Sequence, residues 1–230
     1  MIGAGSAKEF RLVAQRFDNF DGPIRVDITG LPPGFTTTTP LTIEPGQLAA
    51  SGVILAAPDA PAPTPENASL GKVTATATIQ GMDVTHDVAP LGEVKLAEKP
   101  KVLIRIESRP DGAQPVGTSP EGWPEYEISP GQTIMLQVRV ERNGLNDEIR
   151  FGTVGSGRNL PFGTYVDNIG LSGLLVDANQ DQREFFVTAL PIAAESTRAF
   201  HLTTAVEGEQ SSWPVILHVR QRTGLASRPE

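Results

Sequence analysis

Apolar and polar residues alternate along most of the chain, in short runs that end at Gly, Pro, Asn or Asp. Alternation over about four to eight residues predicts a β-strand with one buried face, whereas helical spacing is almost absent. The runs recur about every ten residues, which is typical of antiparallel sandwiches rather than of parallel sheets. The clearest runs are Ile24-Val26-Ile28, Val73-Ala75-Ala77-Ile79, Val102-Ile104-Ile106, Ile134-Leu136-Val138-Val140 and Val215-Leu217-Val219. We therefore expect an all-β fold.

The same series of motifs occurs twice, the second time about 125 to 133 residues after the first. The first copy comprises residues 21–26, 30–35 and 41–47, and the second comprises residues 146–151, 159–164 and 174–180. Residues 13–16 also align with residues 140–143, which places Arg16 opposite Asn143. A duplicated module without an obvious chemical site indicates a tandem scaffold rather than an enzyme.

The repeat divides the chain into two predicted domains, residues 1–97 and residues 98–230. The linker Leu96-Ala97-Glu98-Lys99-Pro100 is short and is stiffened by Pro100, so we expect a semi-rigid rod. The first predicted strand of the first domain, at residues 10–16, matches the segment around residue 140 in the second domain. In the second domain a further strand, 102–106, comes before that segment. The first domain is therefore predicted to lack its opening strand and to have an exposed sheet edge.

Composition limits the partners but does not decide the compartment. The formal net charge is −8, which argues against nucleic-acid binding because phosphate recognition needs clustered Lys and Arg. Without cysteine, the sandwiches must be held by packing alone. No apolar run approaches membrane-spanning length, and the first residues do not read as a signal peptide. If the protein is exported, we expect the signal to lie upstream of this sequence.

Two segments carry a resemblance to a known class. Residues 22–35, with Gly30-Leu31-Pro32-Pro33-Gly34-Phe35, and residues 43–47 resemble bacterial immunoglobulin-like modules of large exported proteins, notably of planctomycete type. Such modules are similar to those appended to bacterial glycosidases. The second copy resembles the same class at residues 138–144, 158–161, 166–171 and 183–188, although its loop reads Leu160-Pro161-Phe162-Gly163.

The resemblance implies two tandem antiparallel immunoglobulin-like β-sandwiches. It implies a non-catalytic structural, adhesion or accessory spacer module in a larger exported bacterial protein, located outside the cell or in the periplasm. The implied partners are the other domains of that protein, a polysaccharide or a cell-surface protein.

An alternative function is carbohydrate binding by the loop that contains Trp123 and Tyr126. Flat aromatic rings stack on the C–H face of a sugar, so a solvent-exposed pair would favour this function. If Trp123 instead folds back over the end of the core, the platform does not exist.

A calcium site is the alternative for the acidic string at residues 177–184, in which Asp177, Asn179 and Asp181 alternate as in a calcium loop. Gln182 stands where a calcium loop has its central glycine, and Thr188 stands where it has its final glutamate. An ordinary polar turn is therefore favoured, and we expect no cofactor. Asp18, Asp21, Asp147 and Glu148 form a second acidic set, which we interpret as solvated hairpin tips.

Other reactive residues form no recognisable site. His86, His201 and His218 lie on separate predicted strands; His201 and His218 could share one face, but no third zinc ligand is evident. Ser156 and Ser172 lack the Gly-x-Ser-x-Gly context of a nucleophile. The glycine-rich residues 152–157 lack the lysine and the following helix of a phosphate loop. We therefore do not expect an enzyme.

Overall fold

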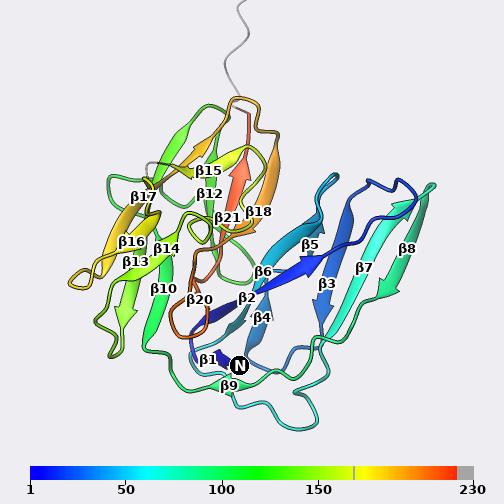
Figure 1. The fold of residues 1–230 in the computed structure, drawn as a ribbon, viewed down its shortest axis with the longest axis horizontal. Coiled ribbons are helices and arrows are strands. Elements are labelled where there is room, and N and C mark those ends of the chain that lie inside the picture. The colour runs from blue at the N-terminus through cyan, green and yellow to red at the C-terminus, as the bar shows by residue number, and fades with distance from the viewer. Residues whose placement is uncertain (168, 222–230) are drawn as a thin grey trace, which may run out of the picture.

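The computed structural model of the chain describes residues 1–167 and 169–221. Every regular element within these residues is a β-strand, as the alternation predicts. The strands form two sandwiches that lie side by side in Figure 1. Asn168, in the motif at 166–171, and residues 222–230 of the predicted second domain lie outside the described residues.

The first sandwich is built from strands of the N-terminal part of the chain. Their bounds are β2 Ala7–Val13, β3 Ile24–Thr29, β4 Phe35–Thr37, β5 Leu41–Ile43, β6 Ala49–Ala56, β7 Lys72–Ile79 and β8 Met82–Asp87. One sheet has the order β5-β3-β7-β8, and the facing sheet contains β4-β6-β2. A short strand β1 (Ile2–Gly3) pairs in parallel with β9 (Leu96–Ala97) at the base of this sandwich.

The second sandwich contains more strands. Their bounds are β10 Val102–Glu107, β11 Gly117–Thr118, β12 Pro124–Ile128, β13 Thr133–Arg142, β14 Ile149–Gly152, β15 Thr164–Asp167, β16 Leu174–Val176, β17 Gln182–Ala189, β18 Ser196–Phe200, β19 Thr203–Thr204, β20 Gln210–Ser211 and β21 Val215–Val219. Its two main sheets have the orders β10-β13-β17-β15 and β11-β12-β21-β18, and β14 pairs with β16 beside them.

Both sandwiches are immunoglobulin-like. The order β10-β13-β17-β15 is the A-B-E-D sheet of an immunoglobulin domain, and β18 with β21 takes the positions of strands F and G. The first sandwich repeats B-E-D as β2-β6-β4 and faces it with β3, β7 and β8 at the C, F and G positions. No strand of the first sandwich takes the position that β10 holds in the second.

The turn before β4 recurs before β15. Gly34 and Gly163 both have a φ of 79°, a backbone conformation that glycine adopts without steric cost. After the first turn Phe35 packs into the core. After the second turn the equivalent residue is Thr164, and the shared geometry survives this change.

The structure corrects the alignment of the two copies by one residue. The backbone N–H of Ala14 donates to the Leu48 carbonyl, and the N–H of Val140 donates to the Asp181 carbonyl at the same point of the ladder. Ala14 therefore corresponds to Val140, and Arg16 corresponds to Arg142 rather than to Asn143. A slip of one residue matters because it would move every side chain to the opposite face of the sheet.

The two sandwiches do not form the expected rod. They stack face to face, so that the β4-β6-β2 sheet lies between the β5-β3-β7-β8 sheet and the β11-β12-β21-β18 sheet of the second sandwich (Figure 1). The β19-β20 hairpin even extends the sheet of the first sandwich, since Ser211 pairs with Ala7 of β2.

Strand β6 explains this packing. Seven of its eight residues are buried, although a strand with one solvated face should alternate. Ala50 packs toward the core of the first sandwich, whereas Val53 and Leu55 pack on Trp123 of the second. Burial of these apolar side chains on both faces favours the side-by-side arrangement over an extended one.

Candidate functional site

The contact between the two sandwiches contains a partly buried polar cluster, which we name the Glu9 cluster: Glu9, Ser51, Arg158, His201 and Thr203. Glu9 belongs to β2 of the first sandwich, and Arg158, His201 and Thr203 belong to the second. A buried carboxylate is costly unless donors surround it, so the contacts of Glu9 decide whether this arrangement stabilises the interface.

Glu9 is well supplied with donors. Arg158 Nε and Nη2 donate to its two carboxylate oxygens at 2.9 and 2.8 Å. His201 Nε2 lies 2.8 Å from Oε2, and the Thr203 hydroxyl donates to Oε2 at 3.2 Å. Arg158 also donates to the Ser51 hydroxyl at 3.0 Å. Such a bidentate, charge-assisted pair is the strong form of an ion pair.

Local backbone pairing positions the two basic side chains. Arg158 and His201 form an isolated antiparallel bridge, with N–H···O distances of 2.8 and 3.1 Å in the two directions. Residues directly opposite each other in an antiparallel pair project to the same face, so both side chains meet Glu9 together.

The cluster holds its members in defined protonation states. Burial by itself would raise the pKa of Glu9, but the hydrogen bonds from His201 and Arg158 outweigh it and lower the pKa to about 2. Burial lowers the pKa of His201, despite the opposing effect of Glu9. The hydrogen bond with Glu9 raises the pKa of Arg158. At neutral pH the cluster thus contains an ionised Glu9, a charged Arg158 and a neutral His201.

The neutral His201 has an assigned tautomer. An ionised carboxylate only accepts hydrogen bonds, so Nε2 carries the proton. Nδ1 is then an acceptor, and it is buried without a partner. Because the side chain of His201 is 0% exposed, no substrate could reach the ring without separating the sandwiches. The cluster is arranged to join two sandwiches rather than to transfer protons to a ligand.

A second set of contacts lies at the base of the interface. The carbonyl of Gly5 accepts hydrogen bonds from Trp213 Nε1 at 2.9 Å and from Arg105 Nη2 at 3.0 Å. The Arg105 guanidinium lies 4.2 Å from the centroid of the Trp213 ring, a favourable cation–π distance. Burial lowers the pKa of Arg105 to about 10.

Beyond the Glu9 cluster the sandwiches diverge and leave a groove of about 1470 Å³. Glu44 and Arg198 form an ion pair across it. Its lining includes the exposed apolar side chains of Leu48, Val154 and Phe162. The described lining of the groove thus combines charged, polar and apolar side chains.

The predicted sugar platform is wrong. Trp123 is 5% exposed and Tyr126 is 1% exposed. Trp123 packs against Ala7, Val53 and Leu55 of the first sandwich, and Tyr126 belongs to the core of the second. Neither ring has a free face, because the docking of the two sandwiches covers Trp123 and the second sandwich's own core covers Tyr126.

An arginine of the chain itself binds the acidic string at residues 177–184. Arg142, whose side chain is 10% exposed, donates to the carbonyl oxygens of Asp177 and Gln180 at 2.9 Å each, and pairs with the Asp181 carboxylate at 3.3 Å. It also donates to the carbonyls of Leu145 and Asp147. The guanidinium therefore takes two backbone carbonyl oxygens and one carboxylate oxygen of the string, whereas Asp177 and Asn179 are exposed. A calcium site at Asp177, Asn179 and Asp181 stays a prediction.

Arg16 makes the equivalent clamp in the first sandwich. It donates to the carbonyls of Glu44 and Gln47, which correspond to Asp177 and Gln180, and to the carbonyl of Gly22. Arg16 thus links the loop after β2 to the turn before β6. Arg142 links the loop after β13 to the turn before β17 in the same way. Among the described residues no group of three or more His, Cys, Asp or Glu could hold a metal ion.

The remaining histidines stay apart from His201. His218 bonds to Glu125 at 3.0 Å and to Thr197 at 2.9 Å, while His201 contacts Glu9, so the two do not share a site. His86 is exposed on β8. Ser156 is buried, and its hydroxyl bonds to backbone groups of Gly152 and Leu174.

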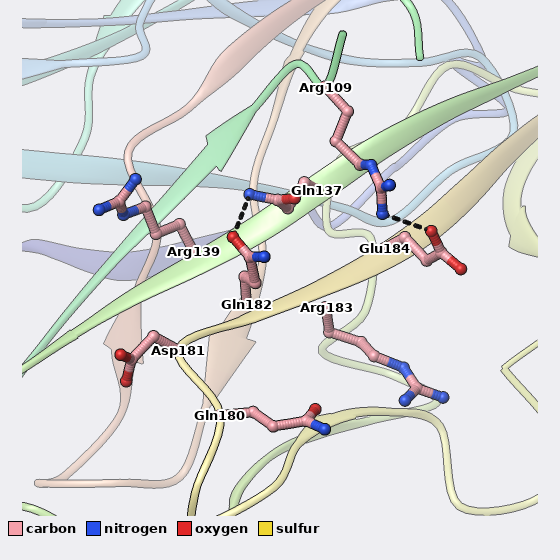
Figure 2. A pocket seen from close by; sticks show the side chains of 8 residues that line it. All are labelled: Arg109, Gln137, Arg139, Gln180, Asp181, Gln182, Arg183 and Glu184. Atoms are coloured by element: carbon pink, nitrogen blue, oxygen red, sulfur yellow. Dashed lines mark hydrogen bonds and ion pairs between the residues drawn. The ribbon is translucent and has the colours of Figure 1, made fainter. Parts of the chain in front are cut away.

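A shallow polar depression of about 600 Å³ lies on the outer face of β13 and β17 (Figure 2). Arg109 pairs with Glu184 at 2.6 Å, and Gln137 donates to Gln182 at 3.1 Å. Figure 2 shows that Arg139 and Arg183 point in different directions rather than toward a common centre. The depression is a solvated sheet face whose charges are of both signs.

Comparisons with known proteins add little detail. No protein-family model and no curated protein matches the chain. Among solved structures, the D0-D1 domain of intimin is 11% identical over 94% of this chain and 93% of that chain, with a TM-score of 0.33. A protein of unknown function from Porphyromonas gingivalis W83 is 11% identical over 94% and 93%, with a TM-score of 0.30. The A168169 segment of titin is 12% identical over 96% and 93%, with a TM-score of 0.28.

These likenesses are too low to carry an argument, and the fold class rests on the strand order. The described residues include no helix long and apolar enough to cross a membrane.

Proposed function

We propose that the chain is a non-catalytic structural module in which two immunoglobulin-like sandwiches form one rigid unit. The observation that carries this proposal is the interface, where the Glu9 cluster and the apolar contacts of Trp123 join strands from both halves. Inter-domain contacts that combine a buried apolar patch with a buried ion pair restrict relative motion, whereas small polar contacts leave domains free.

Such a unit suits a spacer, adhesion or accessory module of a larger exported bacterial protein, acting outside the cell or in the periplasm. Its partners would be the other domains of that protein, a polysaccharide or a cell-surface protein. The resemblance of residues 22–35 to modules of exported proteins supports this setting, and the side-by-side packing adds rigidity to it.

The test is whether the two sandwiches unfold together. Differential scanning calorimetry at neutral pH should give one cooperative transition whose calorimetric and van't Hoff enthalpies agree. Glu9→Gln should split the transition or lower its midpoint, because Arg158 then lacks its counter-charge. Glu93→Gln, a change at an exposed ion pair, should leave both the single transition and its midpoint unchanged. Two separate transitions in the unmodified chain would overturn the proposal.

A further inference from the structure

The strongest unexplained feature is the free edge of β2. In the second sandwich β10 covers the edge of β13 along six consecutive residue pairs. In the first sandwich only Ala7, at the start of β2, has a partner on that side, namely Ser211 of β20. The segment before β2 does not cover the edge, because β1 pairs with β9 instead.

The unpaired backbone groups of β2 can be identified. Alternate residues of an antiparallel strand bond to opposite sides. The carbonyl of Ser6 and the N–H of Ala14 bond to β6 or to its flanks, so the groups of Arg11 and Val13 point away from β6. Their counterparts, Gln137 and Arg139, pair with Glu107 and Arg105 of β10. In the first sandwich the same positions are exposed.

Side chains beneath this edge are also left uncovered. Leu136 and Val138 of β13 are both 0% exposed, whereas their counterparts Phe10 and Leu12 are only partly buried. The contrast arises because β10 supplies Val102, Ile104 and Ile106 to the second core, and nothing in the first sandwich does so.

The facing sheet shows the same lack of cover. Strand β21, at the G position, is buried at three of its five residues, but β8 at the same position has no buried residue. Met82 and Ile79, paired at the β7–β8 turn, are 65% and 40% exposed. Strand β8 forms the outer margin of the molecule in Figure 1. Apolar side chains are therefore left uncovered both at the β2 edge and on β8.

We propose that the edge formed by Arg11 to Val13 of β2 and the two residues that follow, 14–15, binds an extended peptide segment of another protein as an added antiparallel strand. The occupant has apolar residues at alternate positions, facing Phe10, Leu12 and β8, and an acidic residue opposite Arg11. Strand β10 serves as the template for this added strand. When β2 is superposed on β13, Glu107 of β10 lies opposite Arg11 and Arg105 lies opposite Val13. Added strands gain main-chain hydrogen bonds for affinity and alternate side chains for specificity.

The acidic position follows from charge. Arg11 forms no ion pair within the described residues and is exposed at the edge. Exposed charges on edge strands commonly discourage random pairing. A carboxylate on the incoming strand removes this obstacle, so Arg11 selects an acidic partner strand over a basic one.

The probe is a capped peptide of residues 101–108, Lys-Val-Leu-Ile-Arg-Ile-Glu-Ser, added to the full chain. Hydrogen exchange followed by NMR should show new protection of the Arg11 and Val13 amides, which face solvent in the free chain. Fluorescence anisotropy should give saturable binding, and a scrambled peptide should give none.

Two variants test the geometry. Val13→Pro removes an N–H that faces the free edge without touching the β6 ladder, and proline is tolerated on such edges. It should weaken binding about tenfold, whereas Val13→Thr, which keeps the N–H, should change it less than about twofold. Arg11→Glu should weaken binding of this peptide and restore it for the peptide with Lys in place of Glu107.

Three results with the peptide would overturn the proposal. These are unchanged binding to a folded Val13→Pro chain, lack of amide protection at Arg11 and Val13 at saturating peptide, and failure of the charge exchange to restore binding. Concentration-dependent protection of the same amides without peptide would also overturn it, because a second copy of the chain would then occupy the edge.

Discussion

The two sandwiches share strand order, turn geometry and an arginine clamp, yet one core is closed and the other is open. In the second sandwich the side chains of Leu136, Val138 and Phe185 are almost fully buried. In the first, Phe10 and Leu12 of the equivalent strand remain partly exposed. The difference comes from a single strand, β10, which has no counterpart in the first sandwich.

This difference teaches how the first sandwich remains folded. It lacks one strand of cover, but the second sandwich buries the opposite face of its β2-β6-β4 sheet. Strand β6 is thereby buried on both faces, and Glu9 of β2 gains donors from Arg158 and His201. The open sandwich therefore depends on its neighbour more than the closed sandwich does.

The largest effect should come from the same substitution made in both cores. Leu136→Ala should lower the free energy of unfolding by about 3 kcal/mol, because it leaves a cavity in a closed core. Leu12→Ala should cost about 1 kcal/mol, because its side chain is already partly in contact with water. Urea denaturation monitored by circular dichroism measures both. Equal costs would mean that the first core is as closed as the second.

The next effect breaks the dependence of one sandwich on the other. Arg158→Met should cost about 3 kcal/mol, because it leaves Glu9 buried with its main counter-charge removed. The loss should appear first as faster hydrogen exchange in β2 and β6, which rely on the interface, and last in β13 and β17. Arg150→Met, at an exposed ion pair of the second sandwich, is the control and should change little. Uniform loss of protection in both sandwiches would contradict the asymmetry.

The arginine clamps give a comparison with a smaller difference. Arg142 donates to carbonyls in two loops and is 10% exposed, so Arg142→Met should cost about 2 kcal/mol. Arg16→Met removes fewer hydrogen bonds and should cost about 1 kcal/mol. Thermal unfolding of each variant measures this. Lysine at either position should not restore stability, because a single ammonium cannot reproduce the fork of a guanidinium.

Local features of the fold could be predicted from the sequence. The run 102–106 was expected as a strand and is β10, Val102–Glu107, because a period-two pattern depends only on neighbouring residues. The turn at Gly34 was also predictable, since a glycine after two prolines favours a positive φ. The division of the chain at residues 97 and 98 stays a prediction.

The site could not be predicted in the same way. Glu9 contacts Arg158 and His201 across 149 and 192 positions of sequence, and nothing local marks these residues as partners. The sequence left open whether Trp123 is exposed or folds back over the end of its own core, and gave no sign that the other sandwich buries it. The one available signal was the nearly continuous apolar run in β6, since burial on both faces produces such a run.

The smallest predicted effect is a dependence on pH that belongs to the interface alone. His201 has a folded-state pKa below its usual value because of burial, so the unfolded chain binds more protons below about pH 6.5. The stability it contributes is present above that pH and is lost as the pH falls. The free energy of unfolding should therefore fall between pH 7 and pH 5, and the lowered pKa of Glu9 adds a second loss only below about pH 4.5.

His201→Gln tests this assignment, because glutamine can donate to Glu9 but does not titrate. The variant should unfold at nearly the same temperature at pH 7 and pH 5, whereas the unmodified chain should not. His218→Gln is the matched control, since His218 bonds to Glu125 within the second sandwich and should leave the pH dependence in place. If His218→Gln instead removes the pH dependence of the unfolding temperature, that dependence arises in the second sandwich and not at the interface. The open sandwich would then be less dependent on the Glu9 cluster than its geometry implies.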